Sequence, residues 1–385
     1  NTYVTKSGLT NHFATPVAER LGELAAAGTG YTADMQTTFN KVDLDNWGFG
    51  NNEANLARQM ELAAPVANNS IALASFDAGT LIGDELGSRM QALRLPEPGT
   101  DPAGWWIRAA VGEGEADSVK NTYAGYETSY ALTTVGVDKR LSDTSIIGLA
   151  ANFGTTTLEQ HGVRAGDETS LQSTMLSLYG AVDLYDERLT LSGNVTGGSF
   201  DTQSKRSAMA GTVASGNYDQ ELTSVKLAAS YEFPIEGLNA TIAPVLEFER
   251  ANLDQPNYVE TGAEGSNLDV LATSLDRSQV GLGLRYEQTA LIGGMVVKPE
   301  VQIMATQMSG NFVEDVRASF VGDQASEVFT VATPDEQDYD RSGLSLKLGA
   351  TLLMSENSSL VINLDRRQTG DNANTSFNLT SRWEF

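Results

Sequence analysis

The chain contains two histidines, His12 and His161, and no cysteine. A hydrolytic triad needs a histidine that a buried acceptor orients beside a nucleophilic serine, and no ordered group of Ser, His and Asn surrounds either position. The two histidines are far apart in the sequence, so they offer no histidine metal site. The sequence therefore predicts no catalytic residue, no metal ligand and no cofactor.

Four acidic residues stand close together in one polar stretch that we expect to be a loop. They are Glu314, Asp315, Asp323 and Glu327. Such carboxylates can hold divalent cations loosely at a lipopolysaccharide surface. They more often keep a loop hydrated, so this stretch does not change the prediction that the chain holds no metal.

Charged residues recur at every second position in several segments of the chain after residue 100. This period places them on one face of β-strands, opposite an aliphatic face. If that face lines a pore, the charges form paired ladders that hold a polar helix, or they line a conducting channel, and the same residues serve either use. The predicted lumen-facing charges are Arg108, Lys226, Glu232, Glu247, Glu249, Arg285, Glu287, Lys298, Glu300, Lys347, Asp365, Arg367, Arg382 and Glu384.

The strands that position these charges begin at Gly104, where the hydrophobic period changes from about 3.6 to about 2 residues. Tight connections and longer polar connections follow one another along the chain. The tight ones lie near residues 141–144, 185–187, 234–237, 289–293 and 355–358, and the long ones near 114–124, 160–168, 203–219, 253–272 and 310–338. A soluble sandwich also has alternating strands, but this order of connections is typical of a transmembrane barrel.

We therefore predict an all-β fold, a membrane-spanning antiparallel up-and-down β-barrel of about 12 strands. An even strand number leaves both ends of the barrel in the periplasm. Pro244 and Pro299 lie inside expected strands, and because proline has no N–H donor we expect bulges or strand starts there. The expected strands start near residues 104, 125, 145, 169, 188, 220, 238, 273, 294, 340, 359 and 373.

The last nine residues form an amphipathic strand. Phe377, Leu379, Ser381, Trp383 and Phe385 share its apolar face. A chain that stops on an aromatic residue of such a strand resembles the terminal signal of bacterial outer-membrane proteins, where insertion machinery docks the final strand. We predict that Phe377, Leu379, Trp383 and Phe385 form this assembly signal, and the alternative is a terminal edge strand of a soluble sheet.

Residues 1–95 have helical periodicity. Apolar residues recur at three- and four-residue intervals in residues 17–27, 35–42 and 53–64, and again from Ser70 to Leu93. Any of Asn68, Asn69 and Ser70 could cap the last helix, which at ~1.5 Å per residue is about as long as a bilayer is thick. We place this helix in the barrel lumen, and the alternative is a separate helical domain in the periplasm. The predicted lumen-helix residues are Ser70, Asp77, Asp84, Glu85 and Arg89.

The composition excludes other classes of protein. The 50 acidic and 25 basic residues give a net charge of −25, which would repel nucleic acid. The absence of cysteine suits a protein that crosses the periplasm unfolded, and no apolar run is long enough for a transmembrane helix. The mean hydropathy of −0.23 is compatible with alternating strands. Because the chain starts at Asn1 without a signal segment, we expect it to be part of a longer precursor.

Residues 52–385 resemble the translocator (β-barrel) domain of classical monomeric autotransporters, the type Va secretion family. Each motif is weakly specific alone, and their order and spacing together carry the resemblance. The motifs are Asp84–Met90 in the linker, Gly104–Arg108 in the first strand, Tyr126–Arg140 with its Val135–Arg140 in the second strand and its periplasmic turn, the proline-containing strands near 244 and 299, and Arg382–Phe385 at the end.

The resemblance implies a non-enzymatic pore in the outer membrane of a Gram-negative bacterium, which anchors its own N-terminal passenger and helps export it to the cell surface. It divides the chain into a helical linker or end of the passenger (1–68), a helix through the lumen (69–98) and the barrel (104–385). The implied partners are outer-membrane lipid and lipopolysaccharide, the barrel-assembly machinery, periplasmic chaperones and the passenger. Nucleic acid is not among them, and the expected state is a monomer.

Self-cleavage at Asn68-Asn69 is a further hypothesis, because serine-protease autotransporters release their passenger by asparagine cyclisation at an Asn-Asn junction in the lumen. In this chain the residues after the junction differ from that family's, and the junction lies further from the first strand. A second pair, Asn51-Asn52, lies in a glycine-rich loop, so the dipeptide alone is a poor signal. Helix capping is therefore the preferred interpretation.

Two other functions stay open at this point. One is a diffusion porin in which residues 1–95 would be a periplasmic appendage. The other is an outer-membrane barrel enzyme such as a phospholipase, which would need a histidine-dependent serine on its lipid-facing rim.

Overall fold

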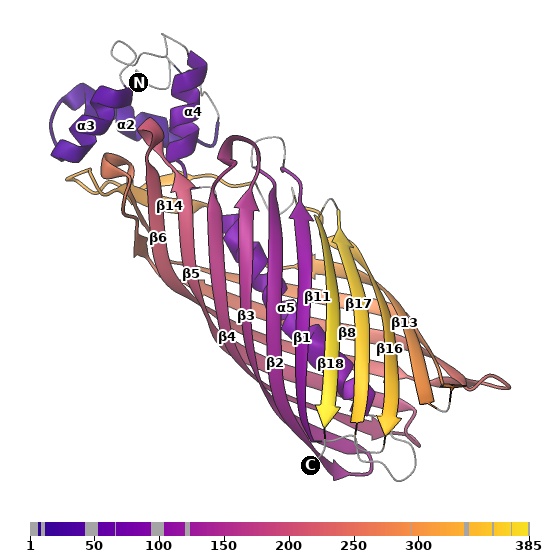
Figure 1. Ribbon diagram of the computed structural model, residues 1–385. Helices are drawn as coiled ribbons and strands as arrows, with labels where there is room; N and C mark the ends of the chain where they lie inside the picture. Colours follow the sequence, from indigo (N-terminus) through magenta and orange to yellow (C-terminus); the bar gives the residue numbers. More distant parts are fainter. Residues whose placement is uncertain are drawn as a thin grey trace.

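The structure is a computed structural model that describes residues 7–8, 12–42, 53–65, 67–93, 104–119, 124–293, 295–334, 339–355, 358–370 and 372–383. Within these residues twelve long antiparallel strands form one closed barrel (Figure 1). The strands are β1 (Trp105–Ala116), β2 (Tyr126–Ser142), β3 (Ser145–Gln160), β4 (Glu168–Leu184), β5 (Leu189–Ser207), β6 (Val213–Tyr231), β8 (Ala240–Gln255), β11 (Thr273–Gln288), β13 (Met295–Ser309), β16 (Ser342–Ser355), β17 (Ser358–Thr369) and β18 (Asn372–Trp383). The pairing of β8 with β11 and of β1 with β18 closes the sheet on itself, which confirms the predicted fold class.

Side chains alternate between two environments along each strand. Outward side chains are apolar and exposed, such as Leu176 at 69% and Leu282 at 65%. Inward side chains are largely polar and buried, such as Thr134 and Asn152, both at 0%. This arrangement reverses that of a soluble sandwich, and it gives the barrel an apolar outer surface that suits lipid.

The two ends of the barrel differ in their connections. One end has tight turns and the short strands β7 (Phe233–Ile235) and β12 (Ala290–Ile292). At the other end, the prediction of a long polar loop at residues 203–219 is wrong, because β5 and β6 stay paired up to Ser207, which lies opposite Val213. Cross-strand hydrogen bonds hold this polar hairpin extended, and they depend on the neighbouring strand, not on local hydrophobicity.

Pro244 and Pro299 lie inside β8 and β13, and no register shift interrupts either strand there. The predicted bulges are therefore wrong. At each proline the pairing on one side is interrupted without a change of register. On β8 the pairing with β6 stops at Val245 and that with β7 begins at Ile242, and on β13 the pairing with β11 stops at Glu300 and that with β12 begins at Val297. A residue without an N–H is tolerated where no ladder bond is required of it.

A second, smaller sheet lies beyond the end of the barrel opposite the C-terminus, and three helices pack on it (Figure 1). Its strands are β9 (Tyr258–Val259), β10 (Leu268–Val270), β14 (Val316–Phe320) and β15 (Phe329–Val331), and the helices are α2 (Thr15–Ala27), α3 (Ala33–Val42) and α4 (Glu53–Ala63). We call α2–α4 together with this sheet the cap. Leu21 and Met35 from the helices share one buried core with Phe320 and Val331 from the sheet. Gly28 ends α2 with a φ of 65°, a conformation that favours glycine.

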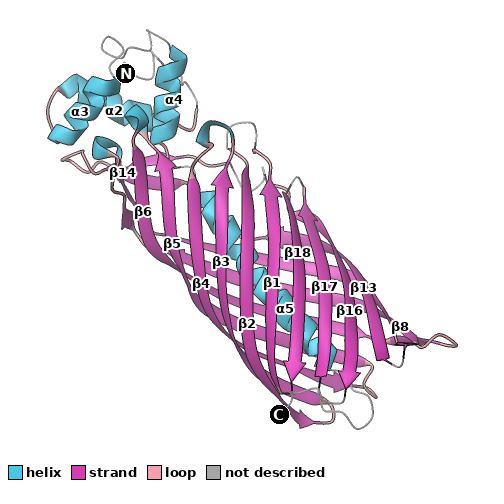
Figure 2. Ribbon diagram, viewed as in Figure 1, coloured by secondary structure: helices cyan, strands magenta, loops and turns pink. Residues whose placement is uncertain are grey.

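The helix α5 (Ala67–Leu93) runs through the barrel interior (Figure 2). Its 27 residues span about 40 Å. The helix begins at Ala67, so Asn68 and Asn69 lie inside its first turn and not before it, where the sequence placed a cap. Among the described helices, none has the length and apolar character of a membrane span.

The last strand generates the first prediction. Leu379 is 40% exposed on the outer face of β18, between Ala109 and Ile362 on the neighbouring strands. Leu379→Arg should destabilise the barrel by up to about 2–4 kcal/mol, because it places a charge against lipid on the strand that closes the sheet. Heat-modifiable migration on gels measures the folded fraction, and Leu379→Val is the matched control. A fully folded Leu379→Arg barrel in membranes would contradict the lipid-facing assignment.

Candidate functional site: the lumen and its helix

The interior of the barrel around α5 is the candidate functional site, because polar and charged side chains of α5 and of the strands meet there. Small and hydroxyl residues let the helix approach the wall. A Cβ added at Gly79 would lie 2.5 Å from Leu222 Cδ2, so any larger residue would require the Leu222 side chain on β6 to move. Ser75 Oγ contacts Gln220 Oε1 at 2.9 Å.

Asp84 is the centre of the ionic contacts between α5 and the barrel. Its carboxylate accepts hydrogen bonds from Lys226 on β6 and from Arg367 on β17. Lys226 Nζ also lies 2.8 Å from Glu247 Oε2 and 4.0 Å from Glu249 Oε2. Because β6 and β17 lie nearly opposite each other in the strand order, Asp84 joins the helix to two sides of the barrel.

Asp77 makes a similar connection one and a half to two turns earlier in the helix. It accepts a hydrogen bond from Arg277 Nη1 on β11 at 2.7 Å and from Asn374 Nδ2 on β18 at 3.0 Å. Arg277 Nη2 also donates to Thr80 Oγ1 at 2.6 Å. The predicted helix residue Ser70 is half-buried in the first turn of α5.

Glu85 is 1% exposed and faces the first strands. Its Oε1 lies 3.4 Å from Arg108 Nε, and its Oε2 accepts a hydrogen bond from Thr134 at 3.2 Å. Arg108 Nη1 donates to the Glu85 carbonyl at 3.0 Å. Thr134 Oγ1 also lies 3.0 Å from Asn152 Oδ1, and Asn152 Nδ2 donates a hydrogen bond to Ser177 Oγ at 3.0 Å. These polar side chains form a row across the strands β2, β3 and β4.

Arg89 binds the C-terminal end of α5 to the barrel wall. Its Nε and Nη2 donate to Asp138 at 2.8 and 2.9 Å, and both side chains are almost fully buried. Tyr179 Oη donates to Asp138 at 2.9 Å, and Trp106 Nε1 donates to Tyr179 at 2.8 Å. The backbone N–H of Gly104 also donates to Asp138, at 2.9 Å. Such a bidentate pair is strong because its other lone pairs are satisfied.

Most of the remaining predicted lumen charges pair along the walls. The pairs are Arg285–Glu232 at 3.6 Å, Lys347–Glu300 at 3.0 Å and Asn378–Asp365 at 2.8 Å. Gln91 of α5 donates to Glu287 at 3.4 Å, and Lys298 is 8% exposed. Arg382 is described by its backbone, which lies opposite Trp106, and Glu384 lies outside the described residues.

The helix does not fill the lumen. A cavity of about 160 Å³ runs beside α5, and its lining includes Asp77, Asp84 and Gln91 of the helix and Lys226 and Arg367 of the wall. A space of this size holds on the order of ten water molecules. The ionic contacts of α5 therefore border a space that water can occupy.

Arg164, in the connection between β3 and β4, joins the cap to the barrel rim. It donates to the backbone carbonyls of Glu61, Leu62 and Ala64 at the C-terminal end of α4. The last carbonyls of a helix lack intrahelical partners and carry partial negative charge, so a cation suits this position. Burial, together with the neighbouring Arg206 cation, lowers the pKa of Arg164 to about 10.

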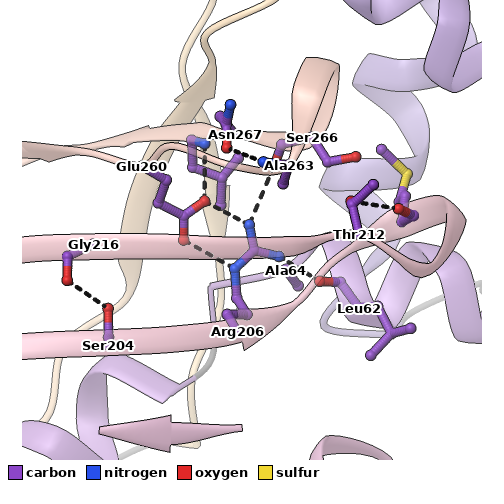
Figure 3. Close-up of polar contacts among 12 residues, drawn as sticks. Leu62, Ala64, Ser204, Arg206, Thr212, Gly216, Glu260, Ala263, Ser266 and Asn267 are labelled. Atoms are coloured by element: carbon purple, nitrogen blue, oxygen red, sulfur yellow. Dashed lines mark hydrogen bonds and ion pairs between the residues drawn. The ribbon is translucent and has the colours of Figure 1, made fainter. Parts of the chain in front are cut away.

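Arg206, at the end of β5, makes a second such contact (Figure 3). Its Nη1 donates to the carbonyl of Leu62, and its Nε and Nη2 bind Glu260 at 2.9 and 2.6 Å. Glu260 also accepts from the backbone N–H of Leu268 at 2.9 Å, in the small sheet. The two arginines thus hold the end of α4 on the rim.

The other candidates from the sequence lie apart from the lumen contacts. Asn68 Oδ1 accepts a hydrogen bond from Tyr258 Oη at 3.1 Å, so its side chain packs against the small sheet. It does not serve as the N-terminal capping residue of α5. His12 lies 3.5 Å from Glu61 in the cap, and His161 lies 3.4 Å from Glu127 at the surface.

Two acidic loop residues have partners within the cap and its surroundings. Asp323 binds Arg20 of α2 at 2.7 and 2.9 Å. Asp315 accepts a hydrogen bond from the backbone of Thr333 at 2.9 Å. These contacts hold the cap together and give the two carboxylates a structural use.

Two residues of the predicted assembly signal face outwards, Phe377 at 46% and Leu379 at 40% exposure. Trp383 is described by its backbone, which pairs with Ser358, and Phe385 lies outside the described residues. Their role in assembly stays a prediction.

Several residues that make the main contacts were missed by sequence reasoning. Arg277, Asn374 and Asp138 lie at inward positions of their strands, so the two-residue period contained the signal for them. Arg164 and Arg206 lie in a loop and at a strand end, where no period indicates their partners.

The sequence of residues 105–365 matches the family of the autotransporter beta-domain. Outer membrane protein A of Rickettsia conorii is 25% identical over 57% of this chain, and Outer membrane protein B of the same organism is 24% identical over 76% of it. The chain spans 11% and 20% of the length of these two relatives.

Solved structures with this fold include two translocators. The translocator domain of the autotransporter NalP from Neisseria meningitidis superposes with a TM-score of 0.60 and 15% identity, over 80% of this chain and 98% of that one. The beta domain of the Bordetella autotransporter BrkA gives a TM-score of 0.53 and 14% identity, over 74% and 100% of the two chains. At these identities the likeness concerns the fold.

The closed barrel with a helix in its lumen defines an outer-membrane barrel of the autotransporter class. The chain belongs to the autotransporter beta-domain family. It is an outer-membrane translocator domain for a passenger, which confirms the resemblance seen in the sequence. A domain of this family is a barrel and not itself catalytic.

The buried ion pair at the inner end of α5 generates the second prediction. Arg89→Ala should lower the free energy of unfolding by about 3–5 kcal/mol, because it leaves the Asp138 carboxylate buried without its cation. Urea unfolding in lipid vesicles, followed by tryptophan fluorescence, measures the change. Asp138→Ala combined with Arg89→Ala should cost little more than either change alone. Fully additive losses would show that the two residues do not act as a pair.

Proposed function

We propose that α5 is the linker of an autotransporter, and that it holds the pore closed after it has connected the barrel to a passenger preceding Asn1. The single observation that carries this proposal is the set of polar contacts along α5, from Asp77 through Asp84 to Arg89, with strands on several sides of the barrel. A helix with no fixed position in the lumen would not need an ionic partner on the barrel wall at each of these three residues. The proposed segments are linker (1–68), lumen helix (69–98) and barrel (104–385).

The same proposal places the cap and the passenger on the outer side of the membrane. In support of this orientation, the cap lies at the end with the long connections, and barrels of this kind carry their long loops outside. The expected surroundings are outer-membrane lipid and lipopolysaccharide. The twelve long strands of the described part of the chain form a closed ring, so none of them offers a free edge along its length, which favours a monomer.

We further propose that barrel-assembly machinery and periplasmic chaperones deliver the chain, with Phe377, Leu379, Trp383 and Phe385 as the recognised signal. The amphipathic pattern of β18 and its position as the closing strand support this part of the proposal.

The third prediction tests the plug against the porin alternative. Deleting residues 1–95 should raise single-channel conductance in planar bilayers several-fold while the barrel stays folded, because α5 occupies the lumen. The unmodified chain is the reference, and heat-modifiable migration verifies folding. A porin with a periplasmic appendage would instead conduct equally well with and without these residues.

The fourth prediction concerns self-cleavage, which we propose does not occur at Asn68-Asn69. The pair lies within the first turn of α5, and Tyr258 binds the side chain of Asn68. Asn68→Asp should leave the pattern of protein products unchanged, and its carboxylate can still accept the hydrogen bond from Tyr258. N-terminal sequencing of the products is the measurement. A new N-terminus at Asn69 that disappears in the variant would overturn this view.

A further inference from the structure

The outer part of the lumen has an apolar belt. The strands that carry polar inward residues at mid-height carry buried apolar ones nearer the cap. The belt consists of Leu158, Leu171, Phe200, Leu222, Leu253, Leu275 and Phe312, none more than 4% exposed. They belong to one buried cluster and come from β3, β4, β5, β6, β8, β11 and the connection after β13.

The register aligns three of the belt residues directly, whereas Leu158, Leu171 and Phe200 lie opposite Thr169, Thr202 and Gln220 and are two residues out of line with the next belt residue. Leu253 lies directly opposite Leu222 on β6 and Leu275 on β11. The backbone hydrogen bond from Asp276 to Asn311, at 3.0 Å, brings Phe312 beside Leu275. Phe312 in turn meets the ring of Tyr339 edge-on, with centroids 5.9 Å apart. Tyr126, on the side of the first strands, also packs against the belt.

The helix closes the belt from within. Ile71, Ala72, Ala74 and Phe76 of α5 belong to the same cluster, and Phe76 is fully buried. None of the seven belt residues, nor Phe76, lines the cavity beside α5, although Ala74 does, so the cavity extends along the helix from Ala74 to Gln91. The same buried cluster continues along α5 through Ile82, Leu86 and Met90, and Ser75 makes a polar contact with Gln220 among the outer apolar residues. What distinguishes Phe76 and the belt is that they do not border the cavity.

We infer that the belt closed by Phe76 is the permeability seal of the pore against hydrated ions and small polar solutes, and that the ion pairs of Asp77, Asp84 and Arg89 hold the helix in register without sealing it. An ion that passes the belt must lose its hydration shell, because the belt side chains offer no polar partner. An ion in the cavity keeps its water. This inference rests on the proposed plugging role of α5 and assigns that role to the part of the helix around Phe76.

The experiment compares Phe76→Ser with Leu81→Ser in the full chain. Leu81 is a partly buried apolar residue of the same helix, five positions further on, and it lines the cavity. Serine is used because an apolar void stays dry, whereas a hydroxyl in the belt provides a site for water. Phe76→Ser should raise single-channel conductance in KCl about twofold or more, and Leu81→Ser should leave it at the level of the unmodified chain.

A second variant tests the same belt from the wall. Phe200→Ser on β5 should also raise conductance, and it keeps the test decisive if Phe76→Ser does not fold by heat-modifiable migration. If deletion of residues 1–95 raises conductance but the two belt variants do not, the belt is not the seal. An equal rise for Leu81→Ser would also overturn the inference. If the deletion itself changes nothing, the plugging role fails, and this inference fails with it.

Discussion

The pairing of β1 with β18 is the contact on which the rest of the structure depends. It joins the first and last strands from Trp106 opposite Arg382 to Glu115 opposite Ala373. In a bilayer an open sheet edge would leave backbone N–H and C=O groups without partners, so closure is obligatory. Closure also encloses a lumen, where side chains from distant parts of the sequence meet around one helix.

The charges in that lumen are complementary between helix and wall. Asp77, Asp84 and Glu85 of α5 face cations of the barrel, and Arg89 faces a barrel carboxylate. Removing a charge from water is costly unless a partner compensates it, so the helix is stable only in the position that satisfies every pair. These contacts specify where the helix lies, whereas the apolar contacts at its outer end exclude water.

The contacts between the cap and the barrel rim hold the N-terminal helices on the barrel. Arg164 and Arg206 come from the barrel, yet they bind the carbonyls that end α4. The helix α4 is thereby fixed to the rim just before α5 enters the lumen. A pull on the N-terminal part of the chain would reach the barrel through these arginines and the core of the cap before it reached α5.

The sequence by itself determined the barrel of about twelve strands, the long helix before it and the apolar face of β18, because a two-residue period and a 3.6-residue period are properties of consecutive residues. It also indicated the inward charges, such as Asp84 and Arg367. Only the tertiary structure decided that the helix lies in the lumen, which charges pair, that prolines 244 and 299 lie where one ladder is interrupted, and that residues 203–219 form a hairpin. Those outcomes depend on neighbours that are distant in the chain. The contacts of Arg164 and Arg206 with the end of α4 and the apolar belt arise for the same reason, since strand stagger and loop folding bring their residues together.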